Sequence, residues 1–226
     1  MDPLRLNDLY DRLLTAYGPQ GWWPGAGDRW VVALGAILTQ RTAWRNAEQA
    51  LDGLRKAGLL TVRALSAAPR ETIERAIRSS GFYRAKAATL QAFAEHVVQA
   101  HRGDLGRLLG QPTDVARCEL LARRGIGPET ADAILLYAGG HPTFVIDAYA
   151  QRLLTRLGWI GGSETDDALR AAFQRALHGD VARANEYHAL IVRHDKEHCR
   201  RRPLCPDCPL LSLCPAVEAT SPEGVR

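Results

Sequence analysis

The sequence is short of lysine and of long apolar runs. Its lysines are Lys56, Lys86 and Lys196, so nearly all of its 29 basic residues are arginines. Because the arginine guanidinium stays protonated, chemistry that needs a neutral amine is confined to three positions. No apolar stretch approaches the roughly 18 residues that a membrane span requires. The amphipathic start, MDPLRLNDLYDRLL, is unlike a signal peptide. We therefore expect a cytoplasmic protein with no membrane partner.

Strand patterns are nearly absent as well. The one strand-like run, TFVID at residues 143–147, is too short to build a sheet. Apolar residues recur at helical spacing instead, and hydrophobic residues make up 46% of the chain, enough for a buried core. The predicted fold class is all-α, a composition change near residue 140 suggests two helical lobes, and the tail 219–226 is expected to be disordered. Helices are predicted over residues 4–17, 30–40, 44–57, 61–67, 69–79, 82–101, 113–122, 128–138, 147–157, 165–177 and 180–197.

Four of the five cysteines lie close together near the end of the chain. Cys199, Cys205, Cys208 and Cys214 are separated by five, two and five residues, and interspersed prolines stiffen the loop. In a reducing compartment this grouping indicates a metal site more than a disulfide framework. Four thiolates can hold a 4Fe-4S cluster or a zinc ion, and the spacing alone leaves that choice open. Cys118 stands apart and is expected in the core.

Basic residues accompany the cysteines. Lys196, Arg200 and Arg201 lie beside Cys199, although acidic residues interrupt the run. The net charge of +4 permits a polyanionic partner without requiring one. The segment is therefore either a solvated basic loop or a surface that contacts phosphates.

The segment ARRGIGPETAD, residues 122–132, predicts a tight turn between two helices. Gly125 and Gly127 allow backbone conformations that side chains disfavour. Gly127 is predicted to be the N-cap of the next helix, and Pro128 its first residue. The exposed N–H groups and the helix dipole would then form an anion site that suits a phosphodiester. A lone Gly-Ile-Gly turn is a weak signal, because many helix pairs turn on glycine.

Four further segments accompany this turn, and together the five resemble the endonuclease III family of helix-hairpin-helix DNA glycosylases. LARRGIGPETADAILLYA looks like the family hairpin, and FVIDAY at residues 144–149 looks like its catalytic segment. GFYRAKA at 81–87 and AILTQRTAW at 36–44 match two further family segments. The cysteine loop matches the family's iron–sulfur loop, with one residue fewer between its first two cysteines. The matches run in the family's order from about residue 30 to 215.

The resemblance implies an architecture, a cofactor and a partner. A six-helix bundle containing the hairpin would span residues 25–138, and residues 1–24 with 139–226 would form a helical iron–sulfur lobe. The resemblance favours a 4Fe-4S cluster over zinc. The implied partner is double-stranded DNA with a damaged or mispaired base, held in a cleft between the lobes. We expect a monomer, associated with the nucleoid if the source is a prokaryote.

The resemblance also implies roles for individual residues. Asp147 would stabilise the positive charge that develops on the sugar as the base leaves, and it could also cap the following helix. Gln40 would fill the space of the extruded base, or else be an ordinary polar residue at a helix end. The residues implied to contact DNA are Gln40, Arg41, Gly125, Ile126, Gly127, Thr130, Lys196, Arg200 and Arg201.

Glu129 is the main departure from the family. Members that also cut the strand carry a lysine two residues past the second hairpin glycine, and its amine forms a Schiff base. A carboxylate cannot form an imine, so we predict a monofunctional glycosylase with little or no lyase activity. Glu129 itself either complements the helix dipole or activates the attacking water while Asp147 stabilises the cation.

Some alternatives stay open at this point. A protein of the same fold could bind damaged or abasic DNA with impaired catalysis, and a metal protein unrelated to DNA is a third reading. The target base could be an oxidised pyrimidine, an alkylated purine or a mismatched base. Trp22, Trp23 and Trp44 could stack on an extruded base or belong to the core.

Overall fold

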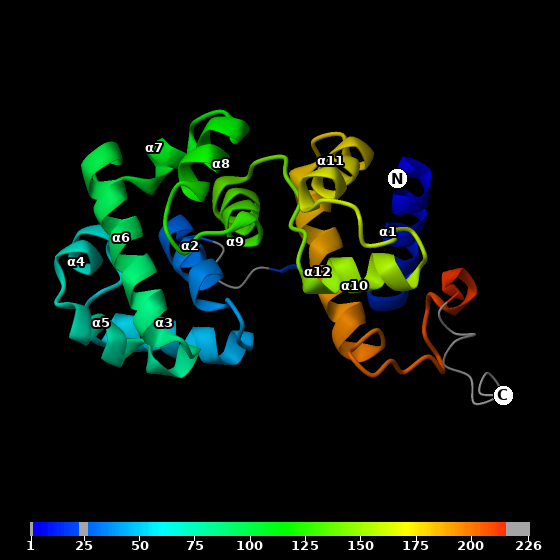
Figure 1. The fold of residues 1–226 in the computed structure, drawn as a ribbon, viewed down its shortest axis with the longest axis horizontal. Coiled ribbons are helices and arrows are strands. Elements are labelled where there is room, and N and C mark those ends of the chain that lie inside the picture. Colours follow the sequence, from blue (N-terminus) through cyan, green and yellow to red (C-terminus); the bar gives the residue numbers. More distant parts are fainter. Residues whose placement is uncertain (1, 23–26, 216–226) are drawn as a thin grey trace. The chain divides into compact units, whose positions relative to one another are not determined.

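The computed structural model describes residues 2–22 and 27–215 (Figure 1). These residues form helices and no strands, so the predicted all-α fold class is confirmed. The chain divides into two compact units, residues 23–141 and residues 1–22 with 142–226. Trp23 and the tail predicted to be disordered, residues 219–226, lie outside the described residues.

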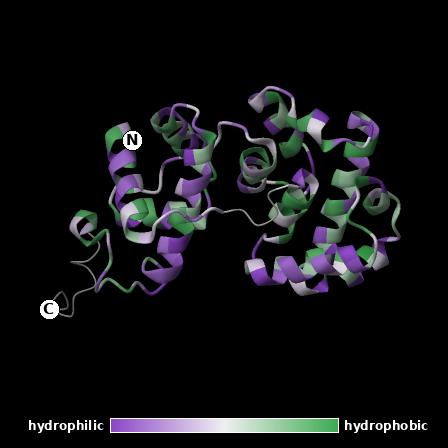
Figure 2. Ribbon diagram, turned by 180° about the vertical axis from the view of Figure 1, so that it is seen from behind, coloured by the Kyte–Doolittle hydropathy of each residue, from purple (hydrophilic) through white to green (hydrophobic). Residues whose placement is uncertain are grey.

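The central unit, residues 23–141, is built around α2 (Arg29–Leu38). Asp28 accepts hydrogen bonds from the backbone N–H groups of Trp30 and Val31 and so caps the start of this helix. Nearly every residue of α2 is buried, and Figure 2 colours it as mainly hydrophobic, whereas α3 (Trp44–Lys56) is largely hydrophilic. The other elements are α3 (Trp44–Lys56), α4 (Val62–Ala67), α5 (Arg70–Ala76), η1 (Arg78–Ser80), α6 (Tyr83–His101), α7 (Leu105–Leu109), α8 (Thr113–Leu121), α9 (Pro128–Ala133) and η2 (Ile134–Gly139).

Several details of this unit differ from the sequence-based expectation. A short helix, α7, forms within a stretch for which no helix was predicted, and Asp104 caps it by accepting from Gly106 N. The helix predicted over 69–79 ends at Ala76 and continues as the 3-10 turn η1. The helix predicted over 128–138 widens after Ala133 into the π-helix η2. Cys118 was expected in the core, but it is exposed, because it lies on the outer face of α8.

The terminal unit combines the N-terminal helix with the last part of the chain. The helices α1 and α12 pack against each other, α11 packs on both, and α10 packs on α12. Leu6, Leu9 and Leu13 bury one face of α1 completely. Phe144 stacks on Phe173 with ring centroids 3.9 Å apart, which fills the centre of this unit. The elements are α1 (Pro3–Tyr17), α10 (Ala148–Arg156), α11 (Asp166–Leu177), α12 (Val181–Glu197) and η3 (Leu211–Leu213).

No helix among the described residues is both long enough and apolar enough to cross a membrane.

A buried lysine fixes the end of α2. The Lys86 ammonium donates to the backbone oxygens of Leu38, at 2.8 Å, and Ser80, at 2.6 Å, while only 4% of the residue is exposed. Leu38 is the last residue of α2, so the amine satisfies a carbonyl group that lacks a partner within the helix. Burial disfavours the charged form and lowers the pKa of Lys86 to about 8.

This lowered pKa predicts a specific dependence of stability on pH. Between about pH 8 and 10.5 the unfolded chain binds the Lys86 proton and the folded chain does not, so the free energy of unfolding rises with pH. Relative to a Lys86→Met variant, the wild type should gain roughly 3 kcal/mol across this range in urea titrations. Lys56→Met, at an exposed position, serves as the control and should show no such gain. Equal pH slopes for wild type and Lys86→Met would contradict the burial of a titrating amine.

Candidate functional site

The hairpin between α8 and α9 depends on one glycine more than on the other. Gly125 has φ +86°, a conformation that side chains rarely adopt, and an added Cβ would lie 2.0 Å from Thr89 Oγ1. Gly127 has φ −91°, so the expectation that it needs a special backbone conformation is wrong. Gly127 is the N-cap of α9 and Pro128 its first residue, as predicted. The Ile126 side chain is 4% exposed and joins the core of the unit.

Gln40 lies against this hairpin. Its side-chain amide donates to Gly125 O and to Thr130 Oγ1, both at 2.9 Å. Thr130 is buried in the first turn of α9. Arg41, the next residue, is exposed and has φ 52°, which turns the chain immediately after α2. The structure therefore brings together Gln40, Gly125 and Thr130, although they come from segments far apart in sequence.

A buried ion pair joins the two helices of the hairpin. The Arg117 guanidinium, from α8, donates to both carboxylate oxygens of Asp132, from α9, at 2.9 and 3.1 Å. The two side chains are 11% and 5% exposed. A two-point pair of this kind fixes orientation as well as distance. This pair could not be identified from the sequence, because nothing in the local pattern shows which charges meet after folding.

Asp147 begins α10 in the terminal unit. Its Oδ1 accepts from the backbone N–H groups of Tyr149, at 3.0 Å, and Ala150, at 2.9 Å. Its Oδ2 lies 3.3 Å from His188 Nε2, and the residue is 9% exposed. Burial alone would raise the pKa of this carboxyl, but the His188 ring and the two N–H groups outweigh burial and hold the pKa below its usual value. Asp147 is therefore a buried carboxylate that stays ionised, and it caps α10 as predicted.

His188 was not identified from the sequence. It lies on α12 and is 5% exposed. One face of its ring stacks on Trp22, with centroids 5.9 Å apart and planes 18° apart, and Phe144 meets it edge-on at 6.1 Å. This packing holds the imidazole at Asp147 from residues distant in sequence. A sequence signal was lacking, because a single histidine in a helix resembles many others.

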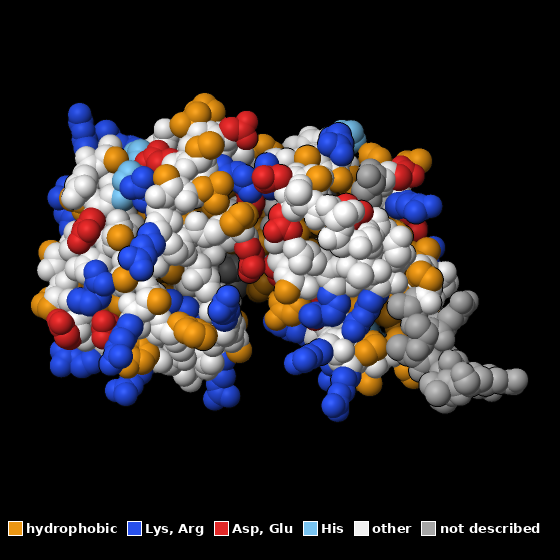
Figure 3. Space-filling model, in the orientation of Figure 1, with side chains coloured by type: hydrophobic (Ala, Val, Ile, Leu, Met, Phe, Trp, Pro, Cys, Tyr) orange, Lys and Arg blue, Asp and Glu red, His pale blue; other side chains and the backbone are white. Residues whose placement is uncertain are grey.

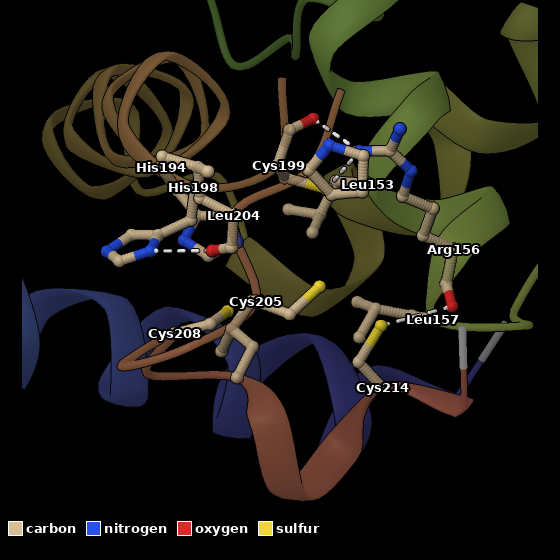
Figure 4. Close-up of a pocket in the computed structure, with 12 residues that line it drawn as sticks. Leu153, Arg156, Leu157, His194, His198, Cys199, Leu204, Cys205, Cys208 and Cys214 are labelled. Atoms are coloured by element: carbon tan, nitrogen blue, oxygen red, sulfur yellow. Dashed lines mark hydrogen bonds between the residues drawn. The ribbon is translucent and has the colours of Figure 1, made fainter. Parts of the chain in front are cut away.

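The four clustered cysteines line one pocket of the terminal unit (Figure 4). The pocket measures about 150 Å³, and apolar side chains such as Leu153, Leu157 and Leu204 form much of its remaining wall. The sulfur atoms face the same space from positions on both sides of η3 and from the end of α12. Four thiol groups around one apolar pocket suit the chemistry of a bound metal centre, which requires thiolate ligands shielded from water.

Two arginines of α10 hold the start of the cysteine loop. Arg156 donates to Cys199 O at 2.7 Å, to Arg200 O at 2.8 Å and to Cys199 Sγ at 3.3 Å. Arg152 donates to Cys199 O at 3.1 Å and pairs with the buried Asp195 carboxylate. Donors aimed at the backbone and at a sulfur atom position this loop. Neither arginine could be singled out from the sequence, since their partners are more than 40 residues away.

The predicted basic residues of this unit are all on its surface. Lys196, Arg200 and Arg201 are exposed. Figure 3 shows Lys and Arg surface gathered around the C-terminal end of α12, where the cysteine loop begins. These side chains can reach a polyanion without losing internal contacts, although Arg200 and Arg201 also supply backbone oxygens to Arg156.

The sequence of this protein is similar to those of known DNA repair proteins. Residues 34–178 match the HhH-GPD superfamily of base excision DNA repair proteins. The chain belongs to this superfamily. It is 39% identical over 208 residues to the putative DNA repair glycosylase MJ1434 of Methanocaldococcus jannaschii, covering 91% of this chain and 94% of the relative. It is 27% identical to endonuclease III of Bacillus subtilis over 160 residues, covering 70% and 68%.

Solved structures show the same fold. A non-covalent endonuclease III–DNA complex superimposes with a TM-score of 0.77 at 22% identity, covering 97% of this chain and 98% of the other. Helicobacter pylori 3-methyladenine DNA glycosylase gives 0.74 at 24% identity, covering 87% and 98%. The resemblance to the endonuclease III family, inferred from the sequence, is thereby confirmed.

Two further observations bear on how an HhH-GPD protein of this sequence would work. Glu129 is exposed in the first turn of α9. It stands at the position where the family resemblance predicts the lysine of the strand-cutting members. Phe82, which sequence analysis did not select, is 66% exposed and has φ 45° at the start of α6. Exposed apolar side chains of this kind are inserted between base steps by many proteins that kink DNA.

The two hairpin glycines provide a matched pair of variants. Gly125→Ala adds a methyl group that collides with Thr89 and forces alanine into a positive φ. We expect it to lower the free energy of unfolding by about 2 kcal/mol or more. Gly127→Ala meets nothing within 4 Å at an ordinary φ, and should change stability by less than about 0.5 kcal/mol. Denaturant unfolding of both variants checks this, and equal losses would contradict the assigned backbone conformations.

Proposed function

We propose that this protein is a DNA glycosylase that extrudes a damaged or mispaired base from duplex DNA and hydrolyses its N-glycosidic bond. The observation that carries this is Asp147, a buried carboxylate that remains ionised at the start of α10. Membership of a base excision repair superfamily supplies the reaction class. Relatives are described as DNA repair glycosylases and endonucleases III, which supports the same reaction here.

Asp147 would act on the sugar. As the base departs, positive charge develops at C1′ and on the ring oxygen, and a fixed negative charge nearby lowers the energy of that transition state. Both oxygens of Asp147 are already oriented by Tyr149 N, Ala150 N and His188. Little reorganisation is therefore needed when the charge appears. A group held in this way stabilises charge more effectively than a mobile surface carboxylate.

The hairpin would hold the DNA backbone. Gly127 leaves the start of α9 open, with nothing within 4 Å of the position of an added Cβ. This open space would let a phosphate approach the first backbone N–H groups of α9. Gln40, which hydrogen-bonds to this turn, and Arg41, which follows it, would enter the space that the base leaves. Lys196, Arg200 and Arg201 would add phosphate contacts that weaken as salt rises.

The reaction would stop at base release. A Schiff base requires an amine at C1′, and the hairpin position offers the Glu129 carboxylate instead. Lys86 cannot serve, because its amine is buried and bonded to Leu38 O and Ser80 O. Water is then the nucleophile, and an intact abasic site is the product. Glu129 would orient or deprotonate that water, a division of labour between two carboxylates as in inverting glycoside hydrolysis.

The cysteine pocket would hold a 4Fe-4S cluster. Cys199, Cys205, Cys208 and Cys214 are the four thiol ligands that such a cluster needs. The endonuclease III resemblance favours it over zinc. When bound, the cluster would cross-link the chain, and Arg156 would hold the loop around it through Cys199 and Arg200.

Variants at Asp147 and His188 test the proposed chemistry. Asp147→Asn keeps a capping side chain, so the fold should survive, but the charge is lost and single-turnover base release should fall about 100-fold or more. His188→Gln removes the ring that lowers the Asp147 pKa, so that pKa rises and the acidic limb of the activity profile moves to higher pH. Mass spectrometry of bases released from duplex DNA carrying oxidised, alkylated and mismatched bases measures both effects.

Base release by the wild-type protein distinguishes the proposed glycosylase from a DNA-binding protein with impaired catalysis. If the wild type binds damaged or abasic duplex DNA but releases no base from such a panel, the protein is the catalytically impaired binding protein. Activity of Asp147→Asn equal to that of the wild type would remove Asp147 from the mechanism.

Borohydride trapping tests the absence of lyase chemistry. With a duplex containing a preformed abasic site, the wild type should give no covalent protein–DNA adduct, because no amine reaches C1′. Glu129→Lys places an amine at the hairpin position and should yield a trapped adduct. Gel electrophoresis under denaturing conditions separates these outcomes, and trapping by the wild type would contradict the monofunctional assignment.

A further inference from the structure

Two histidines and a glutamate to which the proposed function assigns no role lie together in the central unit. His96 and His101 come from the last turns of α6, and Glu119 comes from α8. His96 Nε2 lies 2.6 Å from Glu119 Oε1, and His101 Nε2 contacts the same oxygen. Their side chains are 16%, 12% and 20% exposed, so the group is shielded yet reachable from solvent. Figure 3 shows histidine surface beside acidic surface near the ends of α6 and α7.

The end of α6 makes this convergence possible. Arg102 adopts φ 59°, and Gly103 N donates back to Val97 O at 2.9 Å, which ends the helix directly after His101. Gln111 donates to Glu119 Oε2 at 2.6 Å and fixes the carboxylate from its other side. Burial opposes ionisation of Glu119, but hydrogen bonds from His101, Gln111 and His96 outweigh it and lower its pKa to about 2.

We propose that His96, His101 and Glu119 form a binding site for a divalent transition-metal ion, zinc being the ion best suited to it. One ligand atom from each residue lies within 4.8 Å of the other two. Two imidazole nitrogens and one carboxylate oxygen are a donor set that zinc prefers, and three protein ligands leave a fourth position for water. Gln111 is the outer hydrogen-bond partner that orients such a carboxylate.

Metal binding would replace two hydrogen bonds without moving the helices. Each ring now donates an Nε2 proton to Glu119. In the metal-bound state the ion would take the place of that proton at Nε2, and the ring, still neutral, would carry its proton on Nδ1. Ligand atoms in a tetrahedral zinc site lie about 3.3 Å apart, so the 2.6 Å contact of His96 with Glu119 has to widen slightly. Rotation of the side chains would provide that change.

Binding of the ion would break the hydrogen bond between Arg123 and His96. Its Nη1 donates to His96 Nδ1 at 3.2 Å, and its Nε is buried without a hydrogen-bond partner. When Nε2 of His96 binds a metal, Nδ1 must carry the ring proton, and two donors then face each other. Arg123 has to turn away from His96. Arg123 lies two residues before Gly125 of the hairpin, so the released guanidinium would become available to a phosphate there.

Zinc stoichiometry tests the site. The full-length protein with its iron content verified is dialysed against micromolar zinc, and bound zinc and iron are both measured by inductively coupled plasma mass spectrometry. One zinc per chain is expected in addition to the iron. His101→Gln and Glu119→Gln should each weaken zinc binding at least tenfold, whereas His178→Gln, at an exposed histidine of the other unit, should bind as the wild type does.

Cobalt provides a second readout that is independent of stoichiometry. Bound in the same site, Co²⁺ should add visible ligand-field bands to the difference spectrum of the wild type and not to that of Glu119→Gln. Glu119→Gln keeps the size of the side chain, and circular dichroism verifies that it is folded. Absence of bound zinc in the wild type, or equal binding by wild type, His101→Gln and Glu119→Gln, would overturn the proposal.

The release of Arg123 has its own test, which rests on the proposed function. Zinc loading should steepen the salt dependence of duplex DNA binding by about one unit of slope, as one added phosphate contact predicts. Arg123→Gln should abolish this increment while leaving zinc stoichiometry unchanged. An unchanged slope in the wild type would overturn only the coupling to Arg123. Absence of any DNA binding by the wild type would instead refute the proposed function.

Discussion

The hydrogen bond from the Lys86 ammonium to Leu38 O is the interaction on which the central unit depends. It places a charged amine inside the unit and uses it to end α2. Gln40 and Arg41 follow within three residues, so the point at which they leave the helix is set by that amine. Gln40 then joins the hairpin through Gly125 O and Thr130 Oγ1. The DNA-facing surface that we propose is thus built outward from one buried cation.

Much of the fold could be predicted from the sequence, because helical periodicity and caps are local signals. Asp147 was expected to cap the helix that follows it, and it does so through side-chain hydrogen bonds. The errors have physical causes. The helix α7 is only five residues long, too short to show a period. Cys118 was placed in the core on residue type alone, yet it lies on the outer face of α8.

The residues of the candidate site likewise fall into those that the sequence identifies and those that it does not. Asp147, Glu129, Gln40 and the cysteines could be selected because they occur in short contiguous motifs. His188, Arg156 and Arg117 could not, because each acts on a partner brought near only by folding. The hairpin shows that a motif does not reveal which of its residues is structurally required. Gly125 needs its missing side chain, whereas Gly127 has the backbone of an ordinary residue.

The nine residues of α10 link two places that the sequence keeps far apart. Its first turn orients the Asp147 carboxylate, and its last turn, through Arg156, grips the chain at Cys199 and Arg200. A helix of this length is rigid, so the distance between its two ends is fixed. If the cysteine loop loosened, the same helix would carry the change to Asp147, the residue that we propose as catalytic.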